Sequence, residues 1–125
     1  MMVKINHDRR RERIERFIDD DPWTITVYRD NKGDAADTSF VVDGRLSPAG
    51  TRSLLEMGLP RGPLLGEGPV TQYTHVLVTE WDAEQMIQGD QCVAVHNESE
   101  VTVHLTALFV RHTPFKYEVY LDSRQ

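Results

Sequence analysis

The sequence contains one cysteine and no long apolar run, and each absence excludes a class of protein. A single cysteine, Cys92, cannot form an internal disulfide, which favours a reducing compartment. No segment approaches the ~20 consecutive apolar residues that a membrane-spanning helix requires, and the charged N-terminal residues do not form a secretory signal. We therefore expect synthesis in the cytoplasm. A hydrophobic content of 39% over 125 residues indicates one globular domain with its own core.

Basic residues are scarce outside the N-terminal segment. Residues 1–18 carry 6 basic and 3 acidic side chains, whereas the remaining residues carry 8 basic and 17 acidic ones, and the net charge is −6. Because binding to phosphates requires a basic surface, the acidic body argues against a surface that grips nucleic acid. An acidic surface remains compatible with DNA that slides past it.

Catalytic and metal-binding signatures are also missing, and three histidines fall on separate predicted elements: His75, His104 and His112. Cys92 and His96 share one predicted strand face but lie ~13 Å apart along it, which is too far for two ligands of one metal ion unless the strand bends. A lone cysteine on a strand is typical of a small buried apolar residue. The glycines between positions 58 and 68 are not followed by the Lys-Ser or Lys-Thr pair of a phosphate-binding loop. We therefore expect no enzymatic activity, no metal ion and no cofactor.

Alternating apolar and polar residues, rich in β-branched side chains, predict six strands. They span residues 23–29, 40–46, 70–80, 91–96, 101–111 and 115–122. A bend or bulge is expected at Gly44, inside the second strand. The hairpin across residues 97–100 buries more apolar surface if its turn is irregular, which would place Val93 and Val95 on the core face. The pattern as a whole predicts a mainly β fold, a small β-barrel or sandwich of about six strands.

Two helices are expected beside the strands, one at the N-terminus and one short internal helix. Residues 7–18 form the first, with Asn6 as its N-cap, and the acidic residues 19–21 are expected to end it early. Residues 82–88 form the second helix. Asp82 is the expected N-cap of this helix, Trp81 and Met86 form a hydrophobic staple, and Gly89 ends the helix.

The single domain divides into three predicted parts. Residues 1–22 form a helical arm, residues 23–122 form the barrel, and residues 47–69 form a long Gly/Pro-rich loop within it. The first two turns of the arm are almost all charged, so the arm is either a solvated helix or a segment that docks on another subunit or an acidic partner. A loop of this length is uncommon in a compact domain and is usually functional or partly disordered.

The run from Trp81 to Asp90 is followed by a strand, a hairpin and a chain-ending strand, and Gly44-Arg45 ends an earlier strand. This order of elements resembles the head-closure, or stopper, proteins of long-tailed bacteriophages. The resemblance implies a small β-barrel that assembles as a homo-oligomeric ring in the neck of the virion. Such a ring lies between the portal or adaptor proteins and the tail, and its long loop holds packaged double-stranded DNA in the channel. No membrane partner is implied.

Under this interpretation, the arm docks on its neighbours through five arginines: Arg9, Arg10, Arg11, Arg13 and Arg16. The channel side of the loop is expected to comprise Arg52, Leu54, Leu55, Arg61 and Leu65. Two alternatives stay open: another neck or tail-completion component such as a tail terminator, and a small β-barrel that binds single-stranded nucleic acid. Such a barrel would stack bases on tyrosines. Structural roles are favoured for the four tyrosines of this chain: Tyr28, Tyr73, Tyr117 and Tyr120.

Overall fold

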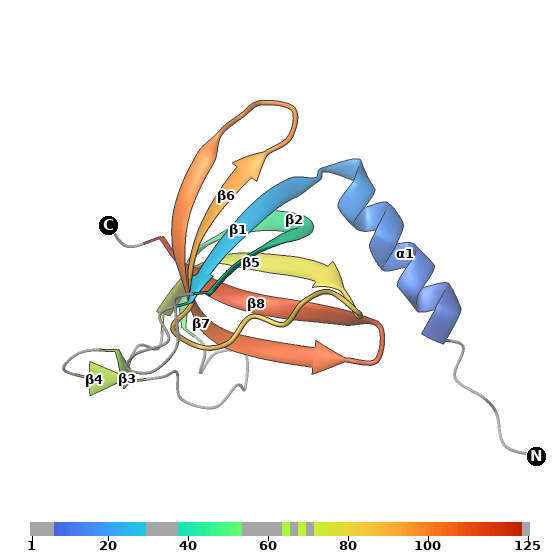
Figure 1. Ribbon diagram of the computed structural model, residues 1–125. Helices are drawn as coiled ribbons and strands as arrows, with labels where there is room; N and C mark the ends of the chain where they lie inside the picture. Colours follow the sequence, from blue (N-terminus) through green and yellow to red (C-terminus); the bar gives the residue numbers. More distant parts are fainter. Residues whose placement is uncertain (1–6, 30–37, 54–63, 66–67, 70–71, 124–125) are drawn as a thin grey trace, which may run out of the picture.

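The computed structural model contains a closed antiparallel barrel of six strands with one helix outside it (Figure 1). It describes residues 7–29, 38–53, 64–65, 68–69 and 72–123. The helix is α1 (His7–Asp20), and the barrel strands follow one another around the wall in the order β1 (Trp23–Arg29), β2 (Thr38–Ser53), β5 (Gln72–Glu80), β8 (Lys116–Asp122), β7 (Thr102–Thr113) and β6 (Gln91–His96). A separate two-stranded sheet consists of β3 (Leu64–Leu65) and β4 (Gly68–Pro69). The predicted mainly β barrel with an N-terminal helix is confirmed.

The main core fills the interior of the barrel, because every second residue of each strand points inward. On neighbouring strands, Ile25 pairs with Val42 on one side and with Ala94 on the other, and all three side chains are buried. On the opposite wall of the barrel, Leu77 of β5 pairs with Val119 of the neighbouring strand β8, and both side chains are buried. Each large apolar side chain buried in this way stabilises the fold by roughly 1.5–3 kcal/mol.

A second, smaller cluster comprises Tyr73, Leu108 and Tyr120, all of them buried. The register of β7 against β8 shifts between Ala107 and Phe109, which places Leu108 in a bulge. The hydroxyl of Tyr120 donates a hydrogen bond to Glu118 at 3.1 Å. Two of the four tyrosines are therefore structural, as the sequence indicated.

Strand β2 is longer than predicted, because it continues through the first part of the expected loop to Ser53. Its pairing with β5 shifts register between Pro48 and Arg52, so the irregularity lies there and not at Gly44. A register shift is where a strand tolerates proline, which has no N–H to donate. The prediction that residues 47–53 belong to a loop is wrong.

The predicted helix over residues 82–88 does not form; this segment consists of turns and irregular backbone. A helix of two turns is marginal on its own, so tertiary contacts decide the conformation. Met86 is buried in the main core, and the backbone N–H of Ile87 donates to the carboxylate of Asp90 at 2.8 Å. Gly89 does adopt a positive φ of 92°, but it does so in a turn, with its N–H donated to Ala107.

The hairpin of β6 and β7 also differs from the prediction. Its register is regular, with Cys92 opposite Leu105 and Ala94 opposite Val103, so the two small side chains point inward. Val93 and Val95 therefore lie on the outer face. The interior of a small barrel is limited in volume and alternates small with large side chains, which favours this register.

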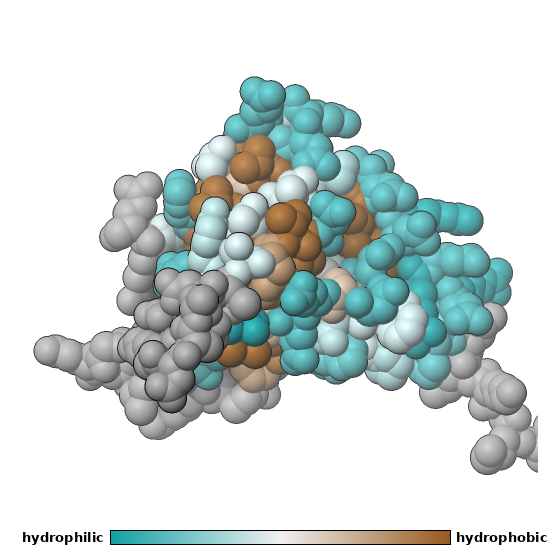
Figure 2. All heavy atoms as spheres, in the orientation of Figure 1, coloured by the Kyte–Doolittle hydropathy of each residue, from teal (hydrophilic) through white to brown (hydrophobic). Residues whose placement is uncertain are grey.

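Helix α1 extends to Asp20, two residues beyond its predicted end, and packs against β2 and β5. The expected N-cap, Asn6, lies outside the described residues. In Figure 2, hydrophilic side chains gather over α1 and over the tip of the β6–β7 hairpin, whereas paler and hydrophobic ones gather below this tip, over the barrel. Within the described part of the chain, no helix is long and apolar enough to span a membrane.

Candidate functional site

Helix α1 contacts the barrel of its own chain through two of the five predicted docking arginines. The guanidinium of Arg11 lies 3.6 Å from the ring centroid of Trp81, and its Nε donates a hydrogen bond to the carbonyl of Pro114 at 2.9 Å. Arg10 lies 5.3 Å from the ring centroid of Phe115. A cation held over an aromatic face stabilises by about 0.5–1 kcal/mol at exposed sites. Arg10 and Arg11 therefore hold the helix on the barrel.

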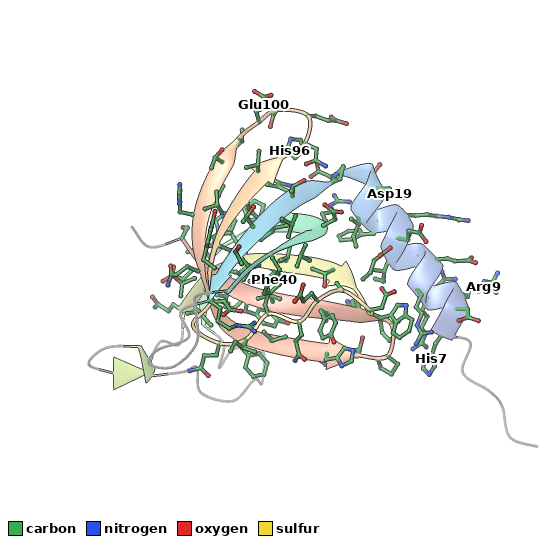
Figure 3. All side chains as sticks on the ribbon, viewed as in Figure 1. His7, Arg9, Asp19, Phe40, His96 and Glu100 are labelled. Atoms are coloured by element: carbon green, nitrogen blue, oxygen red, sulfur yellow. The ribbon has the colours of Figure 1, made fainter. Side chains whose placement is uncertain are left out.

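The other three arginines of α1 share a different, exposed face of the helix. Arg9, Arg13 and Arg16 are spaced i, i+4 and i+7, and all three are exposed. Figure 3 places Arg9 near the N-terminal end of α1 and Asp19 near the junction with β1. Thus the structure does not bring the five arginines together, and three of them form what we call the arginine stripe.

The C-terminal half of α1 is held by Arg45, which extends from β2. Its guanidinium lies 4.2 Å from the ring centroid of Phe17 and donates a hydrogen bond to the Phe17 carbonyl at 3.2 Å. It also lies 3.5 Å from the carboxylate of Asp20. Ile18 is the buried residue of the helix. The Gly44-Arg45 step therefore positions the arm.

Acidic side chains oppose this docking. Burial raises the pKa of Glu80 above its ordinary value of 4.5, and so do nearby carboxylates. These carboxylates come from the segment after β5, from α1 and from β2: Asp82, Glu15, Asp19 and Asp43. The carboxylates of the helix and of the barrel therefore repel each other in the ionised state.

Replacing Glu80 with glutamine should raise the melting temperature by about 2 °C at pH 7, because it removes one partly screened repulsive charge. The pKa of Glu80 is higher in the folded protein than in the unfolded chain. Protonation of Glu80 therefore contributes its full stabilisation of the fold below pH 4.5, and this contribution is lost as the pH rises through the elevated pKa. The advantage of Glu80→Gln should thus vanish near pH 4. Thermal unfolding of both proteins from pH 4 to pH 7 measures this, and an advantage that persists at pH 4 would contradict the electrostatic cause.

A second junction lies where β1 ends, and it is centred on Asp90. This carboxylate is almost fully buried, and Arg29 donates to both of its oxygens, from Nε and from Nη2, at 2.9 Å each. Arg29 also donates to the carbonyl of Gln85 at 3.1 Å. Hydrogen bonding to Asp90 raises the pKa of Arg29, against the lowering caused by burial. The ion pair fixes residues 85–90 against the barrel, and no local sequence signal indicated it.

The structure places only part of the predicted channel loop. Arg52 is the residue of β2 that pairs with Tyr73 of β5, and Leu65 pairs with Gly68 in the small β3–β4 sheet. The other three positions lie outside the described residues: Leu54, Leu55 and Arg61. The helical turn expected near residues 54–59 lies there too.

The described histidines and acids do not form a metal centre. No group of three or more His, Cys, Asp or Glu side chains is placed to hold an ion in the part of the chain that the structure describes. His112 stacks on Tyr117 with ring centroids 4.1 Å apart. His104 is exposed on β7, away from this pair.

His96 links one acid and one hydroxyl in an order that resembles a catalytic triad. Its Nε2 contacts the carboxylate of Asp21, and its Nδ1 lies 2.7 Å from the hydroxyl of Ser99. However, the backbone N–H of Ser99 donates to the same Nδ1 at 3.1 Å, so the imidazole closes the hairpin turn. Asn97 adds a link, because its N–H donates to the carbonyl of Pro22 at 3.2 Å. The cluster ties the hairpin, where Figure 3 labels His96, to the α1–β1 junction.

Comparison with protein-family models, with curated proteins and with solved structures found no match for this chain. The sequence did not single out Arg29, and it indicated Trp81 only as part of a helix staple; the partners of both residues lie far away along the chain.

Cys92 is buried in the main core, as the sequence predicted. Burial raises the pKa of its thiol to about 12. Because the thiolate is the reactive form, Cys92 in the native protein should react with iodoacetamide at pH 8 at least about 100-fold more slowly than in the urea-unfolded protein. Mass spectrometry of timed samples measures both rates. Rapid native alkylation would show that the barrel opens at β6.

Proposed function

We propose that this protein is a structural neck component of a tailed bacteriophage, which forms a ring between the portal or adaptor and the tail. In this position the ring closes the filled head and retains the DNA. The observation that carries the proposal is the placement of two accessory parts on a closed barrel. Helix α1 packs on one side, and the β3–β4 sheet lies at the far end of the molecule from it (Figure 1).

The closed barrel supports assembly through side-chain surfaces. A closed sheet leaves no free strand edge for open-ended strand addition, so subunits meet through faces and arms. The two accessory parts offer contacts on opposite sides, as a ring with neighbours above and below requires. The arginine stripe would dock on an acidic neighbour.

The segment between β2 and β5 supports a role in the channel. It is inserted between two adjacent barrel strands that pair as far as Ser53 and Gln72, so the barrel is complete without it. A segment with this position can contact DNA while the barrel keeps its fold. The net charge of −6 would let DNA pass the remaining surface without being trapped.

The virion phenotype tests this proposal. An amber mutation in the gene, in the phage that encodes it, should yield filled heads that lose their DNA and carry no tails in a non-suppressing host. Complementation with a variant whose residues 54–63 are replaced by a Gly-Ser linker of equal length should restore tails but not DNA retention. Electron microscopy and nuclease protection measure the two outcomes.

A control variant separates the loop from the arm. Replacing Arg9, Arg13 and Arg16 together by glutamine leaves Arg10 and Arg11 on the barrel, so folding should be unchanged while assembly into necks fails. Infectious, tailed particles from the amber mutant would overturn the proposed function. Tailed particles that retain their DNA with the linker variant would overturn the gate alone.

A further inference from the structure

Part of the outer face of four consecutive strands carries almost no charge. In the order β2, β1, β6, β7, their outward side chains form three rows of four, which we call the neutral face. The rows follow from the strand registers. They are Ser39, Tyr28, Gln91 and Thr106; then Val41, Thr26, Val93 and His104; then Asp43, Thr24, Val95 and Thr102.

The composition of this face differs from that of the whole chain. Charged residues make up 27% of the sequence, so about three of twelve positions would be charged at that frequency. The neutral face has one, Asp43, at a corner of the grid. Its centre is made of valine and threonine, and two of its larger side chains are well exposed: Val41 at 60% and Tyr28 at 50%. Depletion of charged residues is the compositional signal of an interface core.

We propose that the neutral face is where a second copy of this chain docks. The charge of the molecule favours this occupant over others. Every copy carries a net charge of −6, so two copies meet with the least repulsion where carboxylates are few. A nucleic acid or a strongly basic partner would find no opposite charge on this face. The docking of a second copy follows from the composition of the neutral face, whereas the position of this contact within a ring rests on the proposed function.

The size of the neutral face sets the expected strength of docking. Strand spacing of ~4.8 Å and a same-face repeat of ~6.6 Å give a footprint of about 380 Å² for twelve residues on four strands. A stable pairwise complex buries about 800 Å² per partner, so this face forms only the centre of an interface. Docking is therefore weak between two free copies and is strengthened when several copies are held next to one another.

The test compares two valines that differ in position but little in exposure. Val41 lies on the neutral face, whereas Val101 is 52% exposed beside the hairpin turn and lies outside the grid. Sedimentation velocity and ¹⁵N-resolved NMR of the full chain, from about 20 µM to about 1 mM, should show concentration-dependent association. The shifting amide signals should belong to β1, β2, β6 and β7. Val41→Glu should weaken the association roughly tenfold or more through like-charge repulsion, and Val101→Glu should leave it unchanged.

The outcomes decide the proposal in either direction. A monomer at every concentration, signals that shift only on other strands, or equal effects of the two variants would each overturn it. Circular dichroism and melting of both variants establish that they fold. The virion experiment is independent, because a tailless amber phenotype together with a monomeric, unshifted protein would leave the neck function in place and reject this face.

Discussion

Replacing Asp90 with alanine is expected to lower the free energy of unfolding by about 3 kcal/mol, the largest effect we expect from an acidic residue of this chain. The carboxylate accepts two hydrogen bonds from Arg29 and one from the backbone of Ile87. Removing it leaves the guanidinium without its partner and the N–H of Ile87 without an acceptor. The side chain of Arg29 is 26% exposed and can regain water, which places the cost at the low end of the range for broken buried pairs.

Urea unfolding monitored by tryptophan fluorescence measures this effect. Asp90→Asn keeps an acceptor for the Ile87 N–H and should cost less than Asp90→Ala. Asp82→Ala is the matched control, because Asp82 is an exposed acid of the same segment and should change the free energy by less than about 0.5 kcal/mol. In a double-mutant cycle, Arg29→Ala should cost little once Asp90 is gone. Equal losses for Asp82→Ala and Asp90→Ala would show that the ion pair does not hold this segment.

The strands could be predicted from the sequence because their signal is local. The alternation of apolar and polar residues depends on which face of a strand is buried, and six such patterns matched six barrel strands. Strand β2 extends further than predicted: Pro48 and Gly50 favoured a loop, but the register shift between Pro48 and Arg52 lets the strand continue.

The errors arise where distant residues decide the local conformation. Residues 82–88 have helix signals, yet Asp90, which follows them closely, pairs with Arg29, 61 residues away along the chain. The sequence of the arm is likewise typical of a solvated helix, yet Arg11 packs on Trp81 and donates a hydrogen bond to the carbonyl of Pro114, 103 residues away. A sequence pattern cannot supply such pairings, because many arginines and acids are equally eligible. The hairpin register was missed for a related reason, since the volume of the barrel interior is set by all six strands.

The two steps that carry the family resemblance both have roles in the fold. Gly44-Arg45 allows close strand approach and holds α1, while Gly89-Asp90 turns the chain and anchors residues 85–90. They are therefore evidence about architecture. The proposed function depends instead on the arginine stripe and the β2–β5 segment, where substitutions should affect assembly more than folding.

Gly44→Ala should lower the free energy of unfolding by about 2–3 kcal/mol through overpacking. A Cβ at this position would lie 2.6 Å from the carbonyl oxygen of Val78 and 2.8 Å from Cδ1 of Leu77. The nearest atom belongs to the backbone of β5, so relief requires the strands to separate and their ladder hydrogen bonds to lengthen. Because α1 rests on the same two strands, its hold through Arg45 should weaken as well.

Two comparisons identify the cause of this loss. Gly89→Ala meets no atom within 4 Å but must hold a φ of 92°, so it should cost about 1 kcal/mol from backbone strain alone. Leu77→Ala removes the second clash but not the first, so it should fail to rescue Gly44→Ala and should add its own cavity cost. If the double variant is more stable than Gly44→Ala alone, the side chain and not the backbone of β5 sets the limit. A loss below about 1 kcal/mol for Gly44→Ala would show that β2 and β5 can move apart cheaply, and the strand contact could then not be what positions the arm.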